Sequence, residues 1–300
     1  MYGAARHHSP EKDKTKMPQL HSANFPVTDD GRTYHLEMAK GMIANRIITV
    51  GDIGRAEKYA SFLDKDSIIL RHQSARGFYT ITGKYNGKAV SIIGIGMGFP
   101  MMDFMMREAL YCFENGSSVA ILRLGTCGTP DEKVSTGDFV IAKDSISIYR
   151  NPDYFTLKHE EKSTEGVEPY IFTLPVSSHP DFQSSLANAF EKFELPYHSG
   201  RNASGDSFYS SQGRKDDRFD DENDFIEKKL QSQGVKAIEM ESFHLLDLAR
   251  CTKGITVKAC AATLVLAQRV QNVFIDVNLK HSREEIMGRV GLEAITNVDL

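Results

Sequence analysis

Arg55 is the first residue in this sequence whose surroundings suggest chemistry. It closes a glycine-rich turn, Gly51-Asp-Ile-Gly-Arg55, that follows the apolar run 47–50. We expect the run to be a strand and the turn to begin a helix, so backbone N–H groups and a guanidinium share one helix N-terminus. A cation there opposes the helix dipole unless an anion lies between them. The turn therefore predicts either an anion site or a solvated arginine.

A second arginine, Arg123, lies inside the apolar run Val119-Ala-Ile-Leu-Arg-Leu. Charged side chains are rarely buried without a partner, so Arg123 requires either a carboxylate or a bound anion. Thr126 follows at the expected strand end and offers a hydroxyl donor. Two arginines, glycine N–H groups and a threonine together indicate a phosphate site.

Two carboxylates, in Glu239-Met240-Glu241, stand where a strand is expected to turn into a helix. A structural interpretation makes them favourable charges on the helix dipole, with the methionine as core filler. A functional interpretation has one glutamate accept hydrogen bonds from a sugar diol while Met240 lies against the sugar. Residues two apart need not face one bond, so a glycosidase pair has little support.

The glycine run Gly94-Ile-Gly-Met-Gly98 does not predict dinucleotide binding. That fingerprint needs a third glycine where this chain has Phe99. We expect a tight turn in which the backbone approaches a ligand or another strand.

Strand and helix patterns alternate along the chain, and they must position these residues. Expected strands are 47–50, 77–84, 89–95, 119–124, 138–143, 198–203, 236–238 and 257–266, and expected helices are 55–63, 100–115 (with Gly116 as its C-cap), 181–193, 240–252 and 283–295. Asn86-Gly87 suits a hairpin between the second and third strands, which makes the sheet mixed. The pattern predicts one α/β domain over 31–300, with a central mixed β-sheet in a three-layer αβα arrangement.

Three polar segments lie outside this alternation. Residues 1–30 are rich in His, Lys, Ser and Pro without an apolar stretch, and we expect a flexible extension rather than a signal peptide. The segments 149–170 and 215–227 are expected to be surface loops.

Composition excludes several classes of protein. The 300 residues carry 36 basic and 40 acidic side chains, and this net charge of −4 offers no electrostatic footprint for nucleic acid. No run approaches the roughly 18 apolar residues of a membrane span. The four cysteines lack zinc-site spacing, and we expect all of them to be reduced core residues of a cytoplasmic protein that holds no metal: Cys112, Cys127, Cys251 and Cys260.

Three motifs in order resemble the nucleoside phosphorylase family whose subunits assemble from dimers. They are Gly-Asp-x-x-Arg at 51–55, Arg-x-Gly-Thr-x-Gly at 123–128 and Glu-Met-Glu-Ser at 239–242, within a match from about Tyr34 to Ile295. The resemblance implies reversible phosphorolysis of a nucleoside, with inorganic phosphate as co-substrate and no cofactor. It also implies a homo-oligomer, at least a dimer with shared active sites.

The segment Ser207-Phe-Tyr-Ser-Ser-Gln-Gly-Arg214 resembles the uracil-binding segment of the family's uridine-cleaving branch. There, Gln212 and Arg214 would contact the pyrimidine carbonyls and ring N–H, and Phe208 would pack on the base. Purine-specific relatives place an aspartate at the position of Val265, beside Leu264, and this apolar pair matches the pyrimidine branch.

The resemblance also assigns the other ligands. Phosphate would be bound by Gly51, Arg55, Arg123 and Thr126, with Arg76 from the partner subunit. The ribose would be bound by Met240 and Glu241, with His35 from the partner subunit and Tyr34 near the sugar. Arg214, Gln212 and Arg123 would be the catalytic residues.

Some features depart from the family or leave alternatives open. Gly77 replaces a glutamate that helps to bind an intersubunit cation in bacterial hexamers, which leaves dimer or hexamer open. The sequence does not assign Arg269, nor does it decide between ribose and deoxyribose or between uracil and thymine. A purine phosphorylase or nucleosidase of the same fold, and a non-catalytic nucleoside-binding relative, remain alternative functions.

Overall fold

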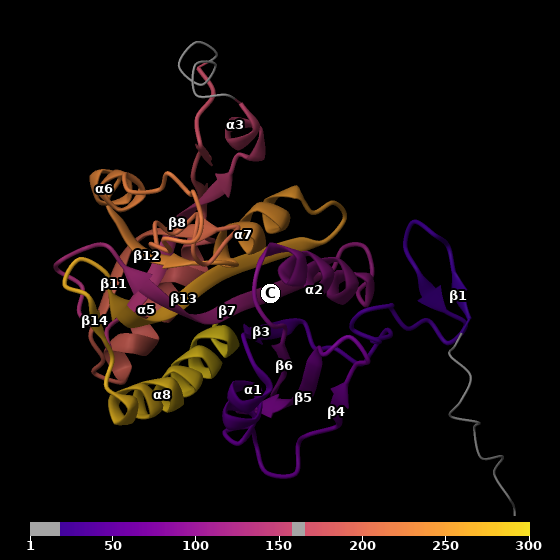
Figure 1. Cartoon of the computed structure of the whole chain (residues 1–300). Helices are drawn as coiled ribbons and strands as arrows, with labels where there is room; N and C mark the ends of the chain where they lie inside the picture. The colour runs from indigo at the N-terminus through magenta and orange to yellow at the C-terminus, as the bar shows by residue number, and fades with distance from the viewer. Residues whose placement is uncertain (1–18, 158–165) are drawn as a thin grey trace, which may run out of the picture.

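The computed structural model describes residues 19–157 and 166–300 (Figure 1). Most of the extension predicted at 1–30 and the middle of the loop predicted at 149–170 lie outside these residues. Within them, the predicted α/β class with a mixed sheet is confirmed.

A 12-stranded mixed sheet forms the centre of the molecule. Its main path is, in spatial order, β14 (Val273–Phe274), β13 (Thr256–Gln268), β8 (Phe139–Arg150), β11 (Tyr197–Gly205), β12 (Val235–Glu239), β7 (Ser118–Thr129), β3 (Arg46–Val50), β6 (Lys88–Gly94), β5 (Tyr79–Tyr85) and β4 (Leu70–Gln73). Two short strands pair with β8 off this path, β9 (Tyr170–Phe172) and β10 (Val176–Ser177). The predicted hairpin is β5–β6, and its turn has positive φ at Asn86 and Gly87.

Part of this sheet closes on itself, which the strand pattern of the sequence did not predict. β13 runs parallel to β7 over nearly its whole length and also pairs antiparallel with β8. Because β8, β11, β12 and β7 are paired in turn, these strands and β13 form a ring. The ring brings the ends of β7, β12 and β13 together.

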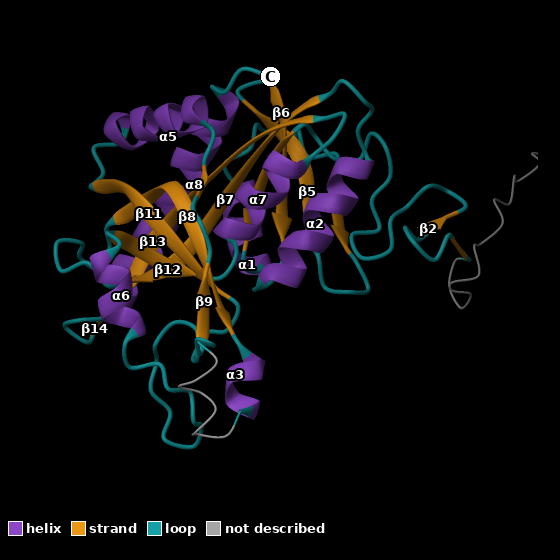
Figure 2. Ribbon diagram, turned by 90° about the horizontal axis from the view of Figure 1, so that it is seen from above, coloured by secondary structure: helices purple, strands orange, loops and turns teal. Residues whose placement is uncertain are grey.

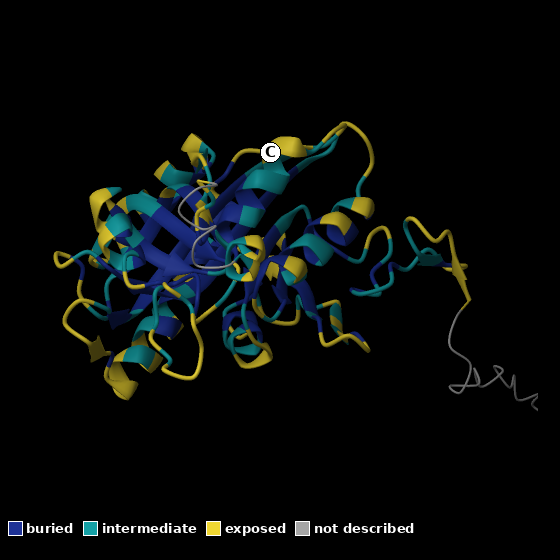
Figure 3. Ribbon diagram, turned by 45° about the horizontal axis from the view of Figure 1, so that its top comes forward, coloured by how far each residue is buried: buried dark blue, intermediate teal, exposed yellow. Residues whose placement is uncertain are grey.

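Helices cover both faces of the sheet (Figure 2). They are α1 (Ile53–Ala60), α2 (Phe99–Tyr111), α3 (Pro152–Thr156), α5 (Pro180–Lys192), α6 (Ile226–Ser232), α7 (Ser242–Cys251) and α8 (Val277–Thr296). Alternate residues of a strand point to opposite faces, and the core divides accordingly. Ile47 and Ile121 pack with α2 and α7, whereas Ile48 and Leu122 pack with α1, α5 and α8. The strands between these layers are the most buried part of the chain (Figure 3).

Several boundaries differ from the prediction. The segment from Tyr149 is not wholly loop, because β8 continues to Arg150 and α3 follows it. The charged stretch leads into α6 at Ile226. Gly116 does not cap α2, because that helix already ends at Tyr111.

The cysteine prediction is wrong at one position. Cys112, Cys127 and Cys260 are buried, but Cys251 is exposed at the end of α7. An apolar neighbourhood in the sequence does not fix which side of a helix end faces solvent.

Residues 19–30 form a separate ribbon of β1 (Leu20–His21) and β2 (Val27–Thr28), which stands beside the body of the molecule (Figure 1). Among the described residues, we find no helix with the length and apolar character needed to cross a membrane.

Candidate active site

A cavity of about 290 Å³ opens where β3, β7, β12 and β13 end. Ligands in α/β folds bind beyond such strand ends. The cavity collects nine of the residues singled out from the sequence: Gly51, Arg55, Thr126, Arg123, Phe208, Gln212, Arg214, Met240 and Glu241.

Helix α1 positions Arg55. Asp52 caps this helix by accepting a hydrogen bond from the Arg55 backbone N–H at 2.8 Å, and its other carboxylate oxygen lies 2.8 Å from Arg55 Nη2. The cap explains why the helix begins at Ile53, two residues before the predicted start. Arg55 Nε lies 3.9 Å from Glu284 on α8, so carboxylates hold the guanidinium on two sides.

Arg123 and Glu241 form a buried ion pair. Arg123 Nη2 donates to Glu241 Oε2 at 2.8 Å, and both side chains are more than nine-tenths buried. Glu241 Oε1 also accepts the Gly98 N–H at 2.6 Å. Burial raises the pKa of Glu241, although the Arg123 charge opposes that shift. The partner that the sequence required for Arg123 is therefore a carboxylate.

The two arginines converge on Gly51. A Cβ added there would lie 3.7 Å from Arg55 Nη2 and 3.8 Å from Arg123 Nη2. Within the described residues, Arg123 Nε and Nη1 and Arg55 Nε are buried without a hydrogen-bond partner. Buried donors without an acceptor are unfavourable, so these groups suit an anionic ligand at the glycine turn.

Glu239 has a positioning role in the structure. One of its oxygens accepts the backbone N–H groups of Glu241 and Ser242 at 2.8 and 2.9 Å. The other accepts Asn202 Nδ2 at 2.7 Å and the hydroxyl of Ser204. This network fixes the turn that presents Met240 and Glu241 to the cavity.

The segment 207–214 is a compact loop. The Gly213 N–H donates to the Ser210 carbonyl at 3.1 Å, and the Arg214 N–H donates to the Tyr209 carbonyl at 2.9 Å. Asn223 Nδ2 donates to the carbonyls of Ser210 and Arg214, at 3.0 and 2.9 Å. Buried Asn223 therefore ties the predicted surface stretch 215–227 to the cavity wall.

Arg214 is a desolvated cation in this loop. Its guanidinium carbon lies 4.0 Å from the centre of the Phe208 ring. Burial, and then the charge of Arg269, lower the pKa of Arg214 to about 10. Arg269 donates to the carbonyls of Gln212 and Gly213 at 3.2 and 3.3 Å.

Leu264 and Val265 do not line this cavity, although the resemblance implies that they contact the nucleobase. Both are fully buried, and Leu266 and Ala267 supply the wall at this strand. Because β13 bulges between Val265 and Ala267, counting residues along the strand does not show which of them face the ligand.

His35 and Arg76 lie elsewhere on the chain, and neither lines the cavity of its own subunit. His35 Nδ1 is 2.6 Å from Glu108 Oε1, and its ring stacks on Phe104 at 3.9 Å. Arg76 contacts the hydroxyl and ring of Tyr34.

The sequence missed several residues that build the site. Asn223 and Arg269 support the loop through distant backbone carbonyls, a contact that leaves no spacing signal. Met97 and Phe274 line the cavity from exposed positions, where apolar side chains follow no periodic pattern. Among the described residues, no group of His, Cys, Asp and Glu could hold a metal ion.

Comparison with known proteins agrees with this geometry. A family profile described as Phosphorylase superfamily matches residues 45–287. A "Uridine phosphorylase" of Thermococcus kodakarensis is 28% identical over 257 residues, which cover 84% of this chain and 83% of the relative. A "Purine nucleoside phosphorylase DeoD-type" of Brevibacillus brevis is 30% identical over 218 residues, 72% of this chain and 79% of the relative.

Solved structures are also similar. One, from work on two uridine phosphorylases of the oomycete Phytophthora capsici, has a TM-score of 0.87 and 34% identity, and the match covers 94% of this chain and 100% of that one. A Trypanosoma brucei nucleoside phosphorylase, reported to show uridine phosphorylase activity, has a TM-score of 0.78 and 23% identity, and the match covers 91% of this chain and 100% of that one. This second similarity shows that the fold is shared. The profile spans most of the described domain and confirms the family that the motifs indicated. The chain belongs to the phosphorylase superfamily and is, like these relatives, a pentosyltransferase.

Proposed function

We propose that this protein is a uridine phosphorylase, which converts uridine and phosphate reversibly into uracil and ribose 1-phosphate. The observation that carries the proposal is a single cavity that contains both groups suited to bind phosphate and groups suited to bind the edge of uracil. Arg55 and Arg123 converge at the Gly51 turn, and Gln212 and Arg214 line the same space. The relatives from Thermococcus kodakarensis and Phytophthora capsici support the choice of uridine.

Phosphate binds at the glycine turn. Arg55, Arg123 and Thr126 donate hydrogen bonds to its oxygens, and the ion pair of Arg123 with Glu241 connects the phosphate and sugar sites. Glu241 accepts hydrogen bonds from the ribose diol, while Met240 packs on the sugar. Phosphate is anionic at neutral pH and attacks C1′ without a general base.

The base leaves as its glycosidic bond breaks. Negative charge develops on the uracil carbonyl oxygens while the sugar becomes oxocarbenium-like. Gln212 offers both a donor and an acceptor to the uracil edge, and Arg214 is an obligate donor. Hydrogen bonds that strengthen as this charge develops lower the activation barrier.

The proposal includes a partner subunit. His35 would reach the ribose 5′ hydroxyl and Arg76 the phosphate of a neighbouring chain's cavity, which requires a homo-oligomer. It includes no organic cofactor or metal. The same proposal implies that the protein acts in the cytoplasm, in pyrimidine salvage.

The test is release of free base from purified protein, with and without inorganic phosphate. We expect uracil from uridine only when phosphate is present. Deoxyuridine and thymidine measure the sugar and base preference, and inosine tests a purine phosphorylase. Release of uracil at an equal rate without phosphate would show a hydrolase, and release of hypoxanthine alone would assign the cavity to purines. Binding of uridine with no release of base under either condition would indicate a non-catalytic relative.

A further inference from the structure

Two surface segments outside the cavity lie side by side. The segment 32–38 carries His35, and the turn 74–77 between β4 and β5 carries Arg76. We call these two segments the donating edge. Arg76 is exposed at the tip of its turn, and His35 is partly exposed. Under the proposed function, His35 and Arg76 bind the ribose and the phosphate in the cavity of a second copy. They can bind both together only if the two segments keep a fixed relative position.

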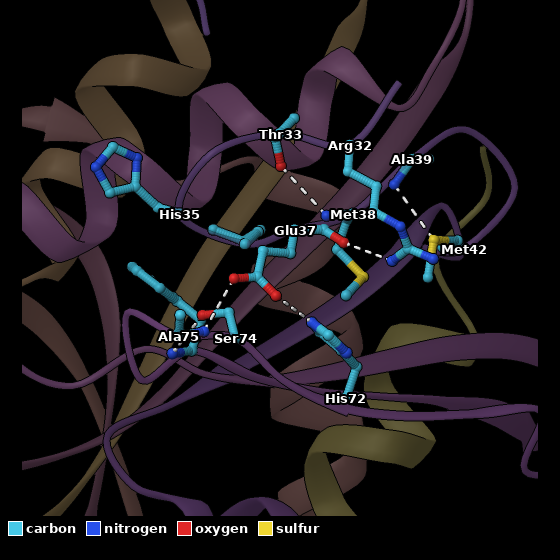
Figure 4. A network of polar contacts seen from close by, with 12 residues as sticks. Arg32, Thr33, His35, Glu37, Met38, Ala39, Met42, His72, Ser74 and Ala75 are labelled. Atoms are coloured by element: carbon cyan, nitrogen blue, oxygen red, sulfur yellow. Dashed lines mark hydrogen bonds and ion pairs between the residues drawn. The ribbon is translucent and has the colours of Figure 1, made fainter. Parts of the chain in front are cut away.

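The carboxylate of Glu37 contacts both the turn and the strand before it (Figure 4). Glu37 Oε1 accepts the backbone N–H of Ala75 at 3.0 Å, next to Arg76 in the chain. Glu37 Oε2 lies 2.8 Å from Nε2 of His72, at the end of β4. One oxygen of Glu37 therefore contacts the Arg76 turn, and the other contacts the strand that leads into it.

The backbone at Glu37 is held in an unusual conformation. Its φ is +57°, a left-handed value that disfavours residues with a Cβ. On either side, Leu36 and Met38 are fully buried. The Glu37 carbonyl accepts a hydrogen bond from Arg32 Nη1 at 2.9 Å. Glycine would suit this backbone better, so the glutamate is explained by its side-chain contacts rather than by local conformation.

The turn that carries Arg76 is closed by its own hydrogen bonds. The Gly77 N–H donates to the Ser74 carbonyl at 3.0 Å, and the Ser74 N–H donates to the Phe78 carbonyl at 2.8 Å. These bonds shape the turn without attaching it to the His35 segment. Among the described residues, the polar part of that attachment consists of the Glu37 contacts and the contact of Arg76 with Tyr34.

We propose that Glu37 is a positioning residue for catalysis in the neighbouring subunit. It locks the Arg76 turn onto the His35 segment, so that the phosphate and ribose contacts of a second copy are delivered as one rigid unit. The inference rests on the proposed function and assigns to Glu37 a role that no motif of the sequence indicated. Small displacements of a binding group lower activity strongly, since productive geometry is narrow.

Glu37→Gly tests the role directly, because glycine accepts the backbone conformation and removes only the side chain. The matched control is Asp66→Gly, since Asp66 also has a φ of +57° and is exposed outside the donating edge. We expect Glu37→Gly to raise KM for both phosphate and uridine about tenfold, with a smaller change in kcat and a thermal midpoint close to that of Asp66→Gly. A role confined to stability would lower the thermal midpoint and leave both KM values unchanged.

A double-mutant cycle with Arg76→Ala locates the effect. If Glu37 acts on phosphate through Arg76, adding Glu37→Gly to Arg76→Ala raises the phosphate KM less than about twofold, whereas the uridine KM still rises. Equal phosphate and uridine KM values in Glu37→Gly and Asp66→Gly would overturn the inference and leave the proposed function intact. A wild-type protein that releases no base in phosphate overturns the proposed function, and the role of Glu37 with it.

Discussion

The two arginines at the centre of the cavity differ in their electrostatic surroundings. Arg123 is neutralised by Glu241 in a buried pair, so it is fixed in place before any ligand arrives. Arg214 is desolvated beside Arg269, and in the part of the chain that the structure describes it forms no ion pair. A cation in such surroundings gains most when negative charge appears on a bound molecule. The residue that we propose to stabilise the leaving base is therefore the arginine without a counter-ion among the described residues.

We expect Arg214→Ala to lower kcat for uridine phosphorolysis about 10²–10³-fold, the usual effect of removing one donor to a developing anion. The control is Arg218→Ala in the adjoining stretch 215–227, because the Arg218 side chain is 83% exposed and is paired with Asp216. Steady-state kinetics measures both variants, and thermal unfolding checks that both are folded. A kcat for Arg214→Ala equal to that of the control would exclude Arg214 from stabilising the leaving group.

At the scale of elements, α8 packs on α1, the helix that carries Arg55 of the proposed phosphate site (Figure 1). A Cβ on Gly288 would lie 2.2 Å from Cδ1 of Tyr59, a fully buried residue of α1. Tyr59 follows Arg55 by one helical turn, and Glu284 on α8 faces Arg55 at 3.9 Å. The close contact at Gly288 therefore sets where α1 holds its arginine.

Gly288→Ala should displace α1 despite the better helix propensity of alanine. Overpacking of a dense core lowers the free energy of unfolding by about 1–3 kcal/mol. We also expect a higher KM for phosphate, because Arg55 moves with Tyr59. Denaturant unfolding and phosphate titration measure the two effects, with His281→Ala, on an exposed position of α8, as the control. Adding Tyr59→Leu should recover part of the stability, and no recovery would show that the contact with Tyr59 is not the cause.

At the scale of the molecule, the structural features that residue patterns alone predicted are those formed by residues close together in the sequence. The Gly51–Arg55 turn is one, since a cap and its helix lie within a few residues. The hairpin at Asn86-Gly87 is another. The partner of Arg123 is 118 residues away, so the sequence required a partner without identifying it. The ring closed by β7 and β13 and the cavity wall at Leu266 depend on register between distant strands, which no local pattern encodes.

The same limit applies to the contacts that we propose between subunits. The resemblance assigns His35 and Arg76 to a partner's site, and neither residue lines the cavity of its own chain. Their positions are instead held by Glu108, Tyr34 and Glu37 on the same chain. Under the proposed function, a single chain therefore contributes to two sites, one in its cavity and one through its donating edge.

Mixing two impaired variants tests whether these proposed half-sites combine. Arg214→Ala disables the cavity and leaves the donating edge intact, whereas Arg76→Ala does the reverse. If subunits of a dimer exchange at random, half of the dimers are mixed, and each mixed dimer has one intact site of two. We expect about a quarter of the wild-type activity to return after the variants are unfolded and refolded together. Each variant refolded alone is the control and should keep only its own low activity when phosphate is below saturation. Recovery absent from a refolded, oligomeric mixture would mean that Arg76 acts within its own chain.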